Sequence, residues 1–187
     1  MRRTSNGTGN VDELNLSQLR LLDFGSWYSR EFSSERIPTL SQFLALVQTC
    51  AFDVVMLDVK AFEPLRMDSA WAVLARETSR AGLASKLYVY YPDLWSLSRA
   101  KVLLPGVRTV FGAALVDSSL AAEIIRRHVD FIALTVDGYR DSEASLVRLR
   151  AAGVGSLVYG VSYPLEPDGL VPFPTMVISD WGWARPQ

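Results

Sequence analysis

An alternation of strand-like and helix-like segments runs through the chain from Phe52 onward and limits the folds that it can adopt. Six apolar, β-branched or aromatic runs predict strands at 52–60, 86–91, 108–115, 130–136, 155–161 and 175–180. Between consecutive strands, apolar residues at helical spacing predict helices near 67–82, 94–103, 118–128 and 141–152. This alternation is typical of βαβ units, whose strands form a parallel sheet.

The length of the chain leaves two architectures open. It has 187 residues, enough for one domain with a sizeable core, whereas a closed barrel of eight β/α units takes about 250 residues. Six strands therefore fit either an open doubly wound sheet or a barrel without its first part. Residues 1–50 hold a polar loop and two helical patterns, the second capped by Thr39, and form a lead-in to the β/α units of residues 51–187. We expect both parts to belong to a single domain.

The strand predicted at 52–60 ends in two charged residues, Asp58 and Lys60. Its apolar run predicts burial on both faces, and the two charges, two positions apart, point to the same side. They lie at the carboxyl end, where parallel sheets carry their site residues. Because buried charges are costly without a partner, the pair forms either a structural ion pair or part of a ligand site. This stretch favours neither interpretation.

Composition excludes several functional classes. The formal net charge is −1, so no basic field indicates nucleic acid as a partner. No apolar run reaches the length of a membrane span and no signal peptide is visible, which leaves a soluble cytoplasmic protein as the default. The chain has one cysteine, which excludes an intramolecular disulfide and a cysteine metal cluster.

The residues before the first strand carry a resemblance to a known family. The tract contains Arg3-Thr4-Ser5-Asn6-Gly7-Thr8-Gly9, Leu22-Asp23, Gly25-Ser26-Trp27 and Ile37-Pro38-Thr39-Leu40. In order and spacing it resembles the R-T-T-N-G-x-G … L-x-x-L-D-x-G-S-W … I-P-T-L tract of the glycerophosphodiester phosphodiesterase family. Further along, Leu57-Asp58-Val59-Lys60 resembles the strand end E-I-K of that family, and Ile178-Ser179-Asp180 resembles its I-T-D.

The resemblance implies a (β/α)8 barrel that hydrolyses glycerophosphodiesters to an alcohol and glycerol 3-phosphate, as part of lipid metabolism. It also implies a divalent cation, Ca²⁺ or Mg²⁺, held by acidic residues at strand ends, and two histidines as general acid and base. The family segments H-R-G, E-x-D and H-D have no counterpart in this sequence, whose one histidine, His128, ends a helical pattern. We therefore expect a TIM-barrel-like fold that lacks its N-terminal part and a chain with little or no hydrolytic activity.

The resemblance, together with position at the strand ends, assigns roles to the candidate residues. Asp58 stands where the family has a metal-ligating Glu, and its shorter carboxylate can still bind a hard cation. Lys60 is expected to neutralise a phosphate oxygen. Asp180, Asp137 and Trp181 are further candidates at the mouth of the barrel. Asp137 followed by glycine also fits a plain turn, which is the interpretation that we favour for it. The expected ligand is a glycerophosphodiester or glycerol phosphate.

Two alternatives to a phosphodiesterase remain open. The first is a non-catalytic binding or scaffold protein on a degenerate barrel, which still holds a phosphate or a cation through Asp58 and Lys60. The second is an unrelated six-stranded α/β enzyme with a different site. The missing part of the expected barrel has its own consequence: a barrel without two strands leaves the strands at 52–60 and 175–180 with unpaired edges, which predicts self-association.

Overall fold

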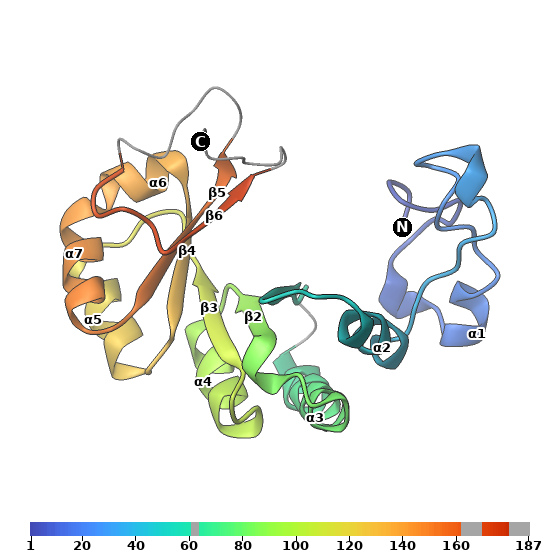
Figure 1. The fold of residues 1–187 in the computed structure, drawn as a ribbon, viewed down its shortest axis with the longest axis horizontal. Coiled ribbons are helices and arrows are strands. Elements are labelled where there is room, and N and C mark those ends of the chain that lie inside the picture. Colours follow the sequence, from blue (N-terminus) through green and yellow to red (C-terminus); the bar gives the residue numbers. More distant parts are fainter. Residues whose placement is uncertain (61–63, 162–169, 180–187) are drawn as a thin grey trace. The chain divides into compact units, whose positions relative to one another are not determined.

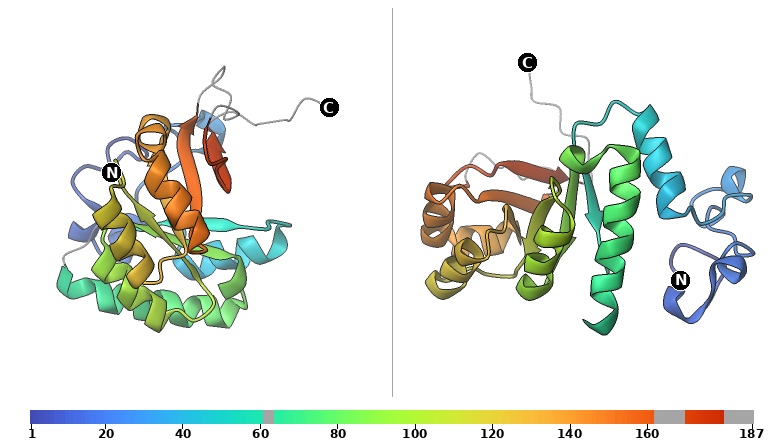
Figure 2. Two further views of the ribbon diagram at one scale, coloured as in Figure 1. Left: turned by 90° about the vertical axis from the view of Figure 1, so that its left-hand side faces the viewer. Right: turned by 90° about the horizontal axis from the view of Figure 1, so that it is seen from below.

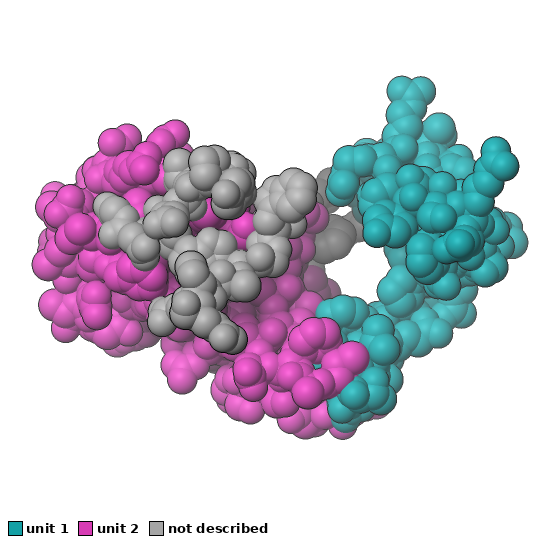
Figure 3. Space-filling view, turned by 45° about the horizontal axis from the view of Figure 1, so that its top comes forward, with its two compact units in different colours: residues 1–49 teal, residues 50–187 magenta. Residues whose placement is uncertain are grey.

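The computed structural model describes residues 1–60, 64–161 and 170–179, with residues 64–66 described by their backbone alone. The chain divides into two compact units, Met1–Thr49 and Cys50–Gln187, which Figure 3 distinguishes by colour. The division falls within a residue of the boundary expected between the lead-in and the β/α units. That the two parts form a single domain stays a prediction.

The first unit consists of short helices joined by turns. They are η1 (Val11–Glu13), α1 (Leu16–Leu19), η2 (Arg30–Phe32) and α2 (Leu40–Thr49). The side chain of Asn15 caps α1 by accepting a hydrogen bond from the backbone N–H of Gln18 at 3.0 Å. Thr39 caps α2 as predicted, because its hydroxyl accepts the backbone N–H of Gln42 at 3.2 Å.

The second unit is built on one sheet of six strands, all parallel and in the order of the sequence. The strands are β1 (Val55–Asp58), β2 (Leu87–Tyr91), β3 (Arg108–Gly112), β4 (Phe131–Thr135), β5 (Gly155–Val161) and β6 (Met176–Ser179). The sheet curls into a half-barrel (Figure 1). This confirms the predicted barrel-like α/β fold with six parallel strands.

Helices cover the outer, convex side of the half-barrel (Figures 1 and 2). They are α3 (Pro64–Ala81), α4 (Leu94–Leu103), α5 (Ser118–Arg126), α6 (Val136–Asp141) and α7 (Glu143–Ala151), with a short η3 (Ala84–Lys86) before β2. None of the described helices has the length and apolar character needed to span a bilayer. The edges β1 and β6 end the sheet, and self-association through them stays a prediction.

The alternation of side chains along each strand separates two apolar layers. In β2 the residues Leu87, Val89 and Tyr91 are buried under the helices, where the Tyr91 ring meets Trp71 of α3 edge to face at 5.8 Å. The intervening residues face the inside of the half-barrel. There the buried side chains of Val110, Ala133 and Leu157 form a second cluster, packed against partly buried Met56, Tyr88, Tyr90, Phe131, Tyr159 and Met176. The inside of the half-barrel is therefore a packed floor.

Three features differ from the sequence-based expectations. β1 is shorter than predicted and only partly buried, because it is the first strand of the sheet and pairs on one side alone. The prediction that this run is buried on both faces was therefore wrong. Residues 136–141 form α6, where a turn and loop were expected. This helix begins directly after β4, because the Thr135 hydroxyl accepts the Gly138 N–H at 3.2 Å and caps it.

A network around Asp130 ties the amino ends of two strands to α4. The carboxylate of Asp130 accepts hydrogen bonds from the backbone N–H and the hydroxyl of Thr109, at 2.8 and 2.9 Å. It also pairs with Lys101 at 2.5 Å. Burial opposes ionisation of Asp130, but the hydrogen bonds from Lys101 and Thr109 outweigh it and hold the pKa of this carboxyl below its usual value. The network therefore stabilises the fold in the ionised state.

The Asp130→Ala variant should lower the free energy of unfolding at pH 7 by about 2 to 4 kcal/mol, because the partners of the carboxylate lose their acceptor. Since the pKa of Asp130 is lower in the folded chain, its contribution is present above the unfolded-state pKa and is lost as the pH falls through the folded-state pKa. Urea unfolding measures the difference in free energy of unfolding between the variant and the unsubstituted chain. This difference should be smaller at about pH 3 than at pH 7. Asp53→Ala, at an exposed position, is the control; a gap that stays constant with pH would contradict the argument.

Candidate functional site

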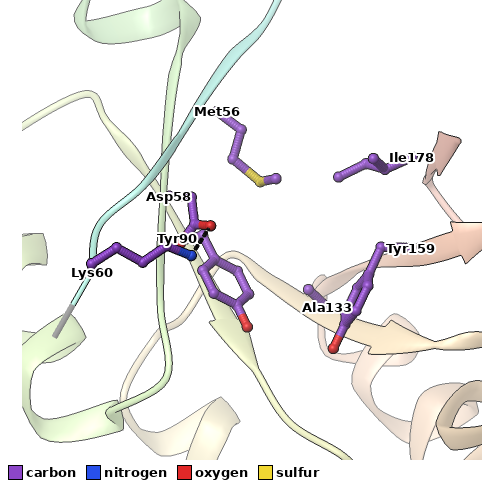
Figure 4. A pocket seen from close by; sticks show the side chains of 7 residues that line it. All are labelled: Met56, Asp58, Lys60, Tyr90, Ala133, Tyr159 and Ile178. Atoms are coloured by element: carbon purple, nitrogen blue, oxygen red, sulfur yellow. Dashed lines mark hydrogen bonds and ion pairs between the residues drawn. The ribbon is translucent and has the colours of Figure 1, made fainter. Parts of the chain in front are cut away.

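A pocket of about 310 Å³ opens on the inner face of the half-barrel. Figure 4 shows the side chains that line it, which come from five of the six strands or the residues directly after them: Met56, Asp58, Lys60, Tyr90, Ala133, Tyr159 and Ile178. The floor is apolar, and the polar groups are one carboxylate, one ammonium and two phenol hydroxyls. This is the composition of a site for a small polar ligand that also has a hydrocarbon part.

Asp58 and Lys60 lie side by side at the carboxyl end of β1. The backbone N–H of Val59 donates to the carbonyl of Tyr90 at 3.2 Å and continues the pairing with β2 past the end of β1. Both charged side chains therefore fall on the pocket side, as their spacing predicted, and they form an ion pair.

The ion pair contributes little to stability. The side chain of Lys60 is 79% exposed and that of Asp58 is 50% exposed, and pairs with this exposure stabilise a fold by less than about 1 kcal/mol. Structural necessity therefore does not account for the pair. A phosphate oxygen that approached Lys60 would meet an ammonium group that is already oriented toward the pocket.

Tyr90 occupies its place because Gly112 of the neighbouring strand has no side chain. A Cβ at Gly112 would lie 2.1 Å from the Tyr90 hydroxyl oxygen and 2.4 Å from Cζ. The phenol ring therefore lies directly over the end of β3, and glycine is required there for close approach rather than for backbone freedom. Burial, followed by the nearby Tyr159 and Asp58, raises the pKa of the Tyr90 phenol, while Lys60 opposes the shift. At neutral pH Tyr90 is a neutral hydrogen-bond donor.

The other residues proposed from the sequence fall in different places. Asp137 lies in the first turn of α6, where its side chain is 92% exposed and 3.7 Å from Arg140, and it does not line the pocket. Its interpretation as a plain turn was wrong, because it is helical. Ile178 lines the pocket, so the inward alternation expected for this strand holds at that position. Asp180 and Trp181 lie outside the described residues, and their roles stay predictions.

His128 lies at the end of the sheet opposite the pocket. It follows α5 and precedes β4, so it stands at the amino end of the strands, opposite the carboxyl ends that carry the pocket. Its backbone has φ 55°, and its N–H donates to the carbonyl of Ile125 at 3.0 Å while that of Val129 donates to Ile124 at 3.3 Å. These two bonds form a Schellman motif. The histidine therefore terminates a helix, in agreement with the capping role expected of it.

The described residues offer few ligands for a metal ion. Among them no group of three His, Cys, Asp or Glu side chains could hold one, and Asp58 is the one carboxylate that they contribute to the pocket. Calcium requires six to eight oxygen ligands and magnesium about six. The described donor set therefore does not by itself fit the predicted divalent cation, and the prediction of Ca²⁺ or Mg²⁺ remains untested.

The curled parallel sheet and the pocket at its carboxyl ends define the class of TIM-barrel-like α/β proteins. Within that class, the sequence model of the "glycerophosphoryl diester phosphodiesterase family" matches residues 1–172. The chain belongs to this family. The family resemblance proposed from the N-terminal tract is thereby confirmed.

Individual relatives match parts of the chain. YhdW of Bacillus subtilis strain 168, named as a candidate glycerophosphodiester phosphodiesterase, is 52% identical over 42 residues, which are 22% of this chain and 17% of YhdW. The crystal structure of the glycerophosphodiester phosphodiesterase from Agrobacterium tumefaciens C58 is similar with a TM-score of 0.67 and 20% identity, over 88% of this chain and 66% of that one.

A phosphodiesterase from Oleispira antarctica, solved in complex with the product sn-glycerol 3-phosphate, is similar with a TM-score of 0.74 and 19% identity. The match covers 87% of this chain and 64% of that chain. This chain thus spans slightly less than two thirds of the length of both solved relatives. At these identities the likeness establishes the fold.

Among the polar residues of the pocket, Tyr90 and Tyr159 were not singled out as site residues from the sequence. The available signal was the strand alternation itself. Tyr90 lies two positions after Tyr88 and Tyr159 two after Leu157, and both partners belong to the inner cluster. Counting from Asp58 through the register of the sheet pairs Asp58 with Tyr90 and places Tyr159 on the same inner face.

Replacing His128 by glycine should raise the free energy of unfolding by about 1 kcal/mol, because glycine adopts the left-handed conformation without steric cost. The matched control is Gly82→Ala, at φ 65° with no atom within 4 Å of the added Cβ, which should lower stability by a similar amount. Thermal or urea unfolding measures both. A destabilised His128→Gly variant would show that the imidazole makes a contact that its capping position does not explain.

Proposed function

We propose that the pocket binds the glycerol phosphate part of a glycerophosphodiester. The observation that carries the proposal is the exposed Asp58–Lys60 pair at the carboxyl end of β1, beside an apolar floor. Lys60 supplies the positive charge for a phosphate oxygen, and Asp58 orients the ammonium group. Family membership supports this ligand class, as does the Oleispira antarctica relative, whose structure contains sn-glycerol 3-phosphate.

In this proposal the 187-residue chain binds its ligand without hydrolysing it. Cleavage of a phosphodiester by acid–base catalysis needs one group to activate the nucleophile and another to protonate the leaving group. The one histidine of the sequence terminates α5 at the opposite end of the strands. The Tyr90 phenol has a raised pKa and stays protonated at neutral pH, so it cannot act as a base. The described pocket therefore holds no histidine, and its Asp58 carboxylate and Lys60 ammonium are paired with each other.

A divalent cation would enter this site through Asp58, together with oxygen ligands beyond those of the described residues. Such a cation supplies positive charge to a phosphate group. Because the described donor set falls short of six oxygens, we assign the binding role to Lys60 and derive no step from the cation.

The second candidate function is metal-dependent hydrolysis of glycerophosphodiesters, which family membership favours. The two candidates differ in turnover. The chain should release no measurable glycerol 3-phosphate from glycerophosphocholine or glycerophosphoethanolamine, with or without Ca²⁺ or Mg²⁺. Turnover that depends on the cation would decide for the second candidate.

Binding is tested by calorimetric titration of the 187-residue chain with sn-glycerol 3-phosphate. The Lys60→Ala variant should bind about tenfold or more weakly, because it loses a charge-assisted hydrogen bond. Lys86→Ala is the matched control, since it removes the same charge at the amino end of β2, where Lys86 contacts the carbonyl of Phe52 at 3.0 Å. If both variants lose the same affinity, the effect comes from net charge alone and Lys60 has no specific role. If Lys60→Ala keeps full affinity, the proposal is wrong.

A further inference from the structure

Two small residues lie next to each other on the inner wall of the half-barrel. Gly112 of β3 and Ala133 of β4 are direct partners in the register of the sheet, and both are buried. Tyr90 of β2 and Tyr159 of β5 flank them on either side, with Ala133 between the two rings in Figure 4. The Tyr90 ring occupies the space over Gly112. The small side chain of Ala133 leaves a recess between the two aromatic rings.

The two phenol hydroxyls in this recess lack partners within the chain. Neither Tyr90 nor Tyr159 makes a side-chain hydrogen bond to any part of the chain that the structure describes. Tyr139 behaves differently, since its hydroxyl donates to the carbonyl of Pro172 at 2.7 Å and pairs with Ser156 at 2.7 Å. Among the described residues no side-chain oxygen that is shielded from water lacks a partner, so both hydroxyls are accessible from the pocket. The hydroxyls of Tyr90 and Tyr159 are therefore free to bind a ligand.

The recess and the ion pair lie at different positions in the pocket. Asp58 and Lys60 are on the β1 side, whereas Tyr159 and Ile178 are on the β5 and β6 side (Figure 4). A ligand that reaches both needs an anionic group at one end and uncharged hydrogen-bonding groups at the other. Its carbon atoms would contact the faces of the two rings and the Met56 side chain.

We propose that the hydroxyls of Tyr90 and Tyr159 bind the two free hydroxyls of a polyol phosphate, and thereby select a glycerol phosphate group over a phosphate ester without a diol. The assignment rests on the function proposed above, in which Lys60 binds the phosphate. Gly112 acts indirectly as a positioning residue, since it admits the Tyr90 ring over the end of β3. The selectivity of the pocket then comes from the tyrosines and its charge recognition from Lys60.

The test compares two ligands that share the phosphate group, sn-glycerol 3-phosphate and ethyl phosphate, by calorimetry or competition. Tyr90→Phe and Tyr159→Phe each remove one hydroxyl and keep the ring. Each should weaken binding of glycerol 3-phosphate about fivefold, the effect of one hydrogen bond, and leave binding of ethyl phosphate unchanged.

The matched control is Tyr88→Phe. Tyr88 is on the same strand and the same face, two residues before Tyr90, and its ring packs against Phe131 at 5.1 Å without lining the pocket. This variant should bind both ligands like the unsubstituted chain. Gly112→Ala, checked for folding by circular dichroism, should reduce the preference for glycerol 3-phosphate because the added Cβ displaces the Tyr90 ring.

The outcomes separate the two proposals. If Lys60→Ala weakens both ligands while both phenylalanine variants keep the full preference for glycerol 3-phosphate, the tyrosine assignment is wrong and the binding function stands. If the phenylalanine variants lose the preference and Lys60→Ala changes nothing, the tyrosine assignment stands and the phosphate role of Lys60 is wrong. If the unsubstituted chain binds neither ligand, both are wrong.

Discussion

The parallel hydrogen-bond ladder is the constraint on which the other features of the half-barrel depend. Side chains alternate along every strand, and the register is continuous from β1 to β6. Every second side chain of each strand therefore points toward the helices, and the others point into the half-barrel. Asp58, Tyr90, Ala133 and Tyr159 reach one pocket from four strands only because this register holds. A slip of one residue in any strand would move its contribution to the outer layer.

The two ends of the strands have different tasks. At the amino end, Asp130 joins Thr109 and Lys101 in a partly buried network in which each donor has an acceptor. At the carboxyl end, the Asp58–Lys60 pair is exposed and the phenols of Tyr90 and Tyr159 are free of intramolecular hydrogen bonds in the described part of the chain. Polar groups that are satisfied internally stabilise the fold. Polar groups left available to solvent are the ones that can bind a ligand.

The sequence predicted the architecture well because its periodic patterns are long. Six strands and the helices between them were found, and α4 begins and ends at the predicted residues. Two errors have local physical causes. Asp137 and Gly138 were interpreted as a turn, yet both lie in α6. Position 138 is glycine because a Cβ there would come 2.1 Å from the carbonyl oxygen of Ala114, so the glycine allows close packing. The burial of β1 was overestimated because composition does not reveal which strand ends a sheet. The Asp58–Lys60 pair was predictable from spacing, whereas the tyrosine recess was not, since it depends on small residues from two other strands.

The close approach of Tyr90 to Gly112 has a consequence for how such a chain can change over time. Positions 90 and 112 are 22 residues apart in sequence yet occupy one volume, so a side chain gained at the second is tolerated only after the ring at the first has shrunk or moved. The order of the two substitutions therefore matters, and the residues accepted at positions 90 and 112 depend on each other. Two descendants of one ancestor that took the steps in opposite orders would pass through intermediates of unequal fitness.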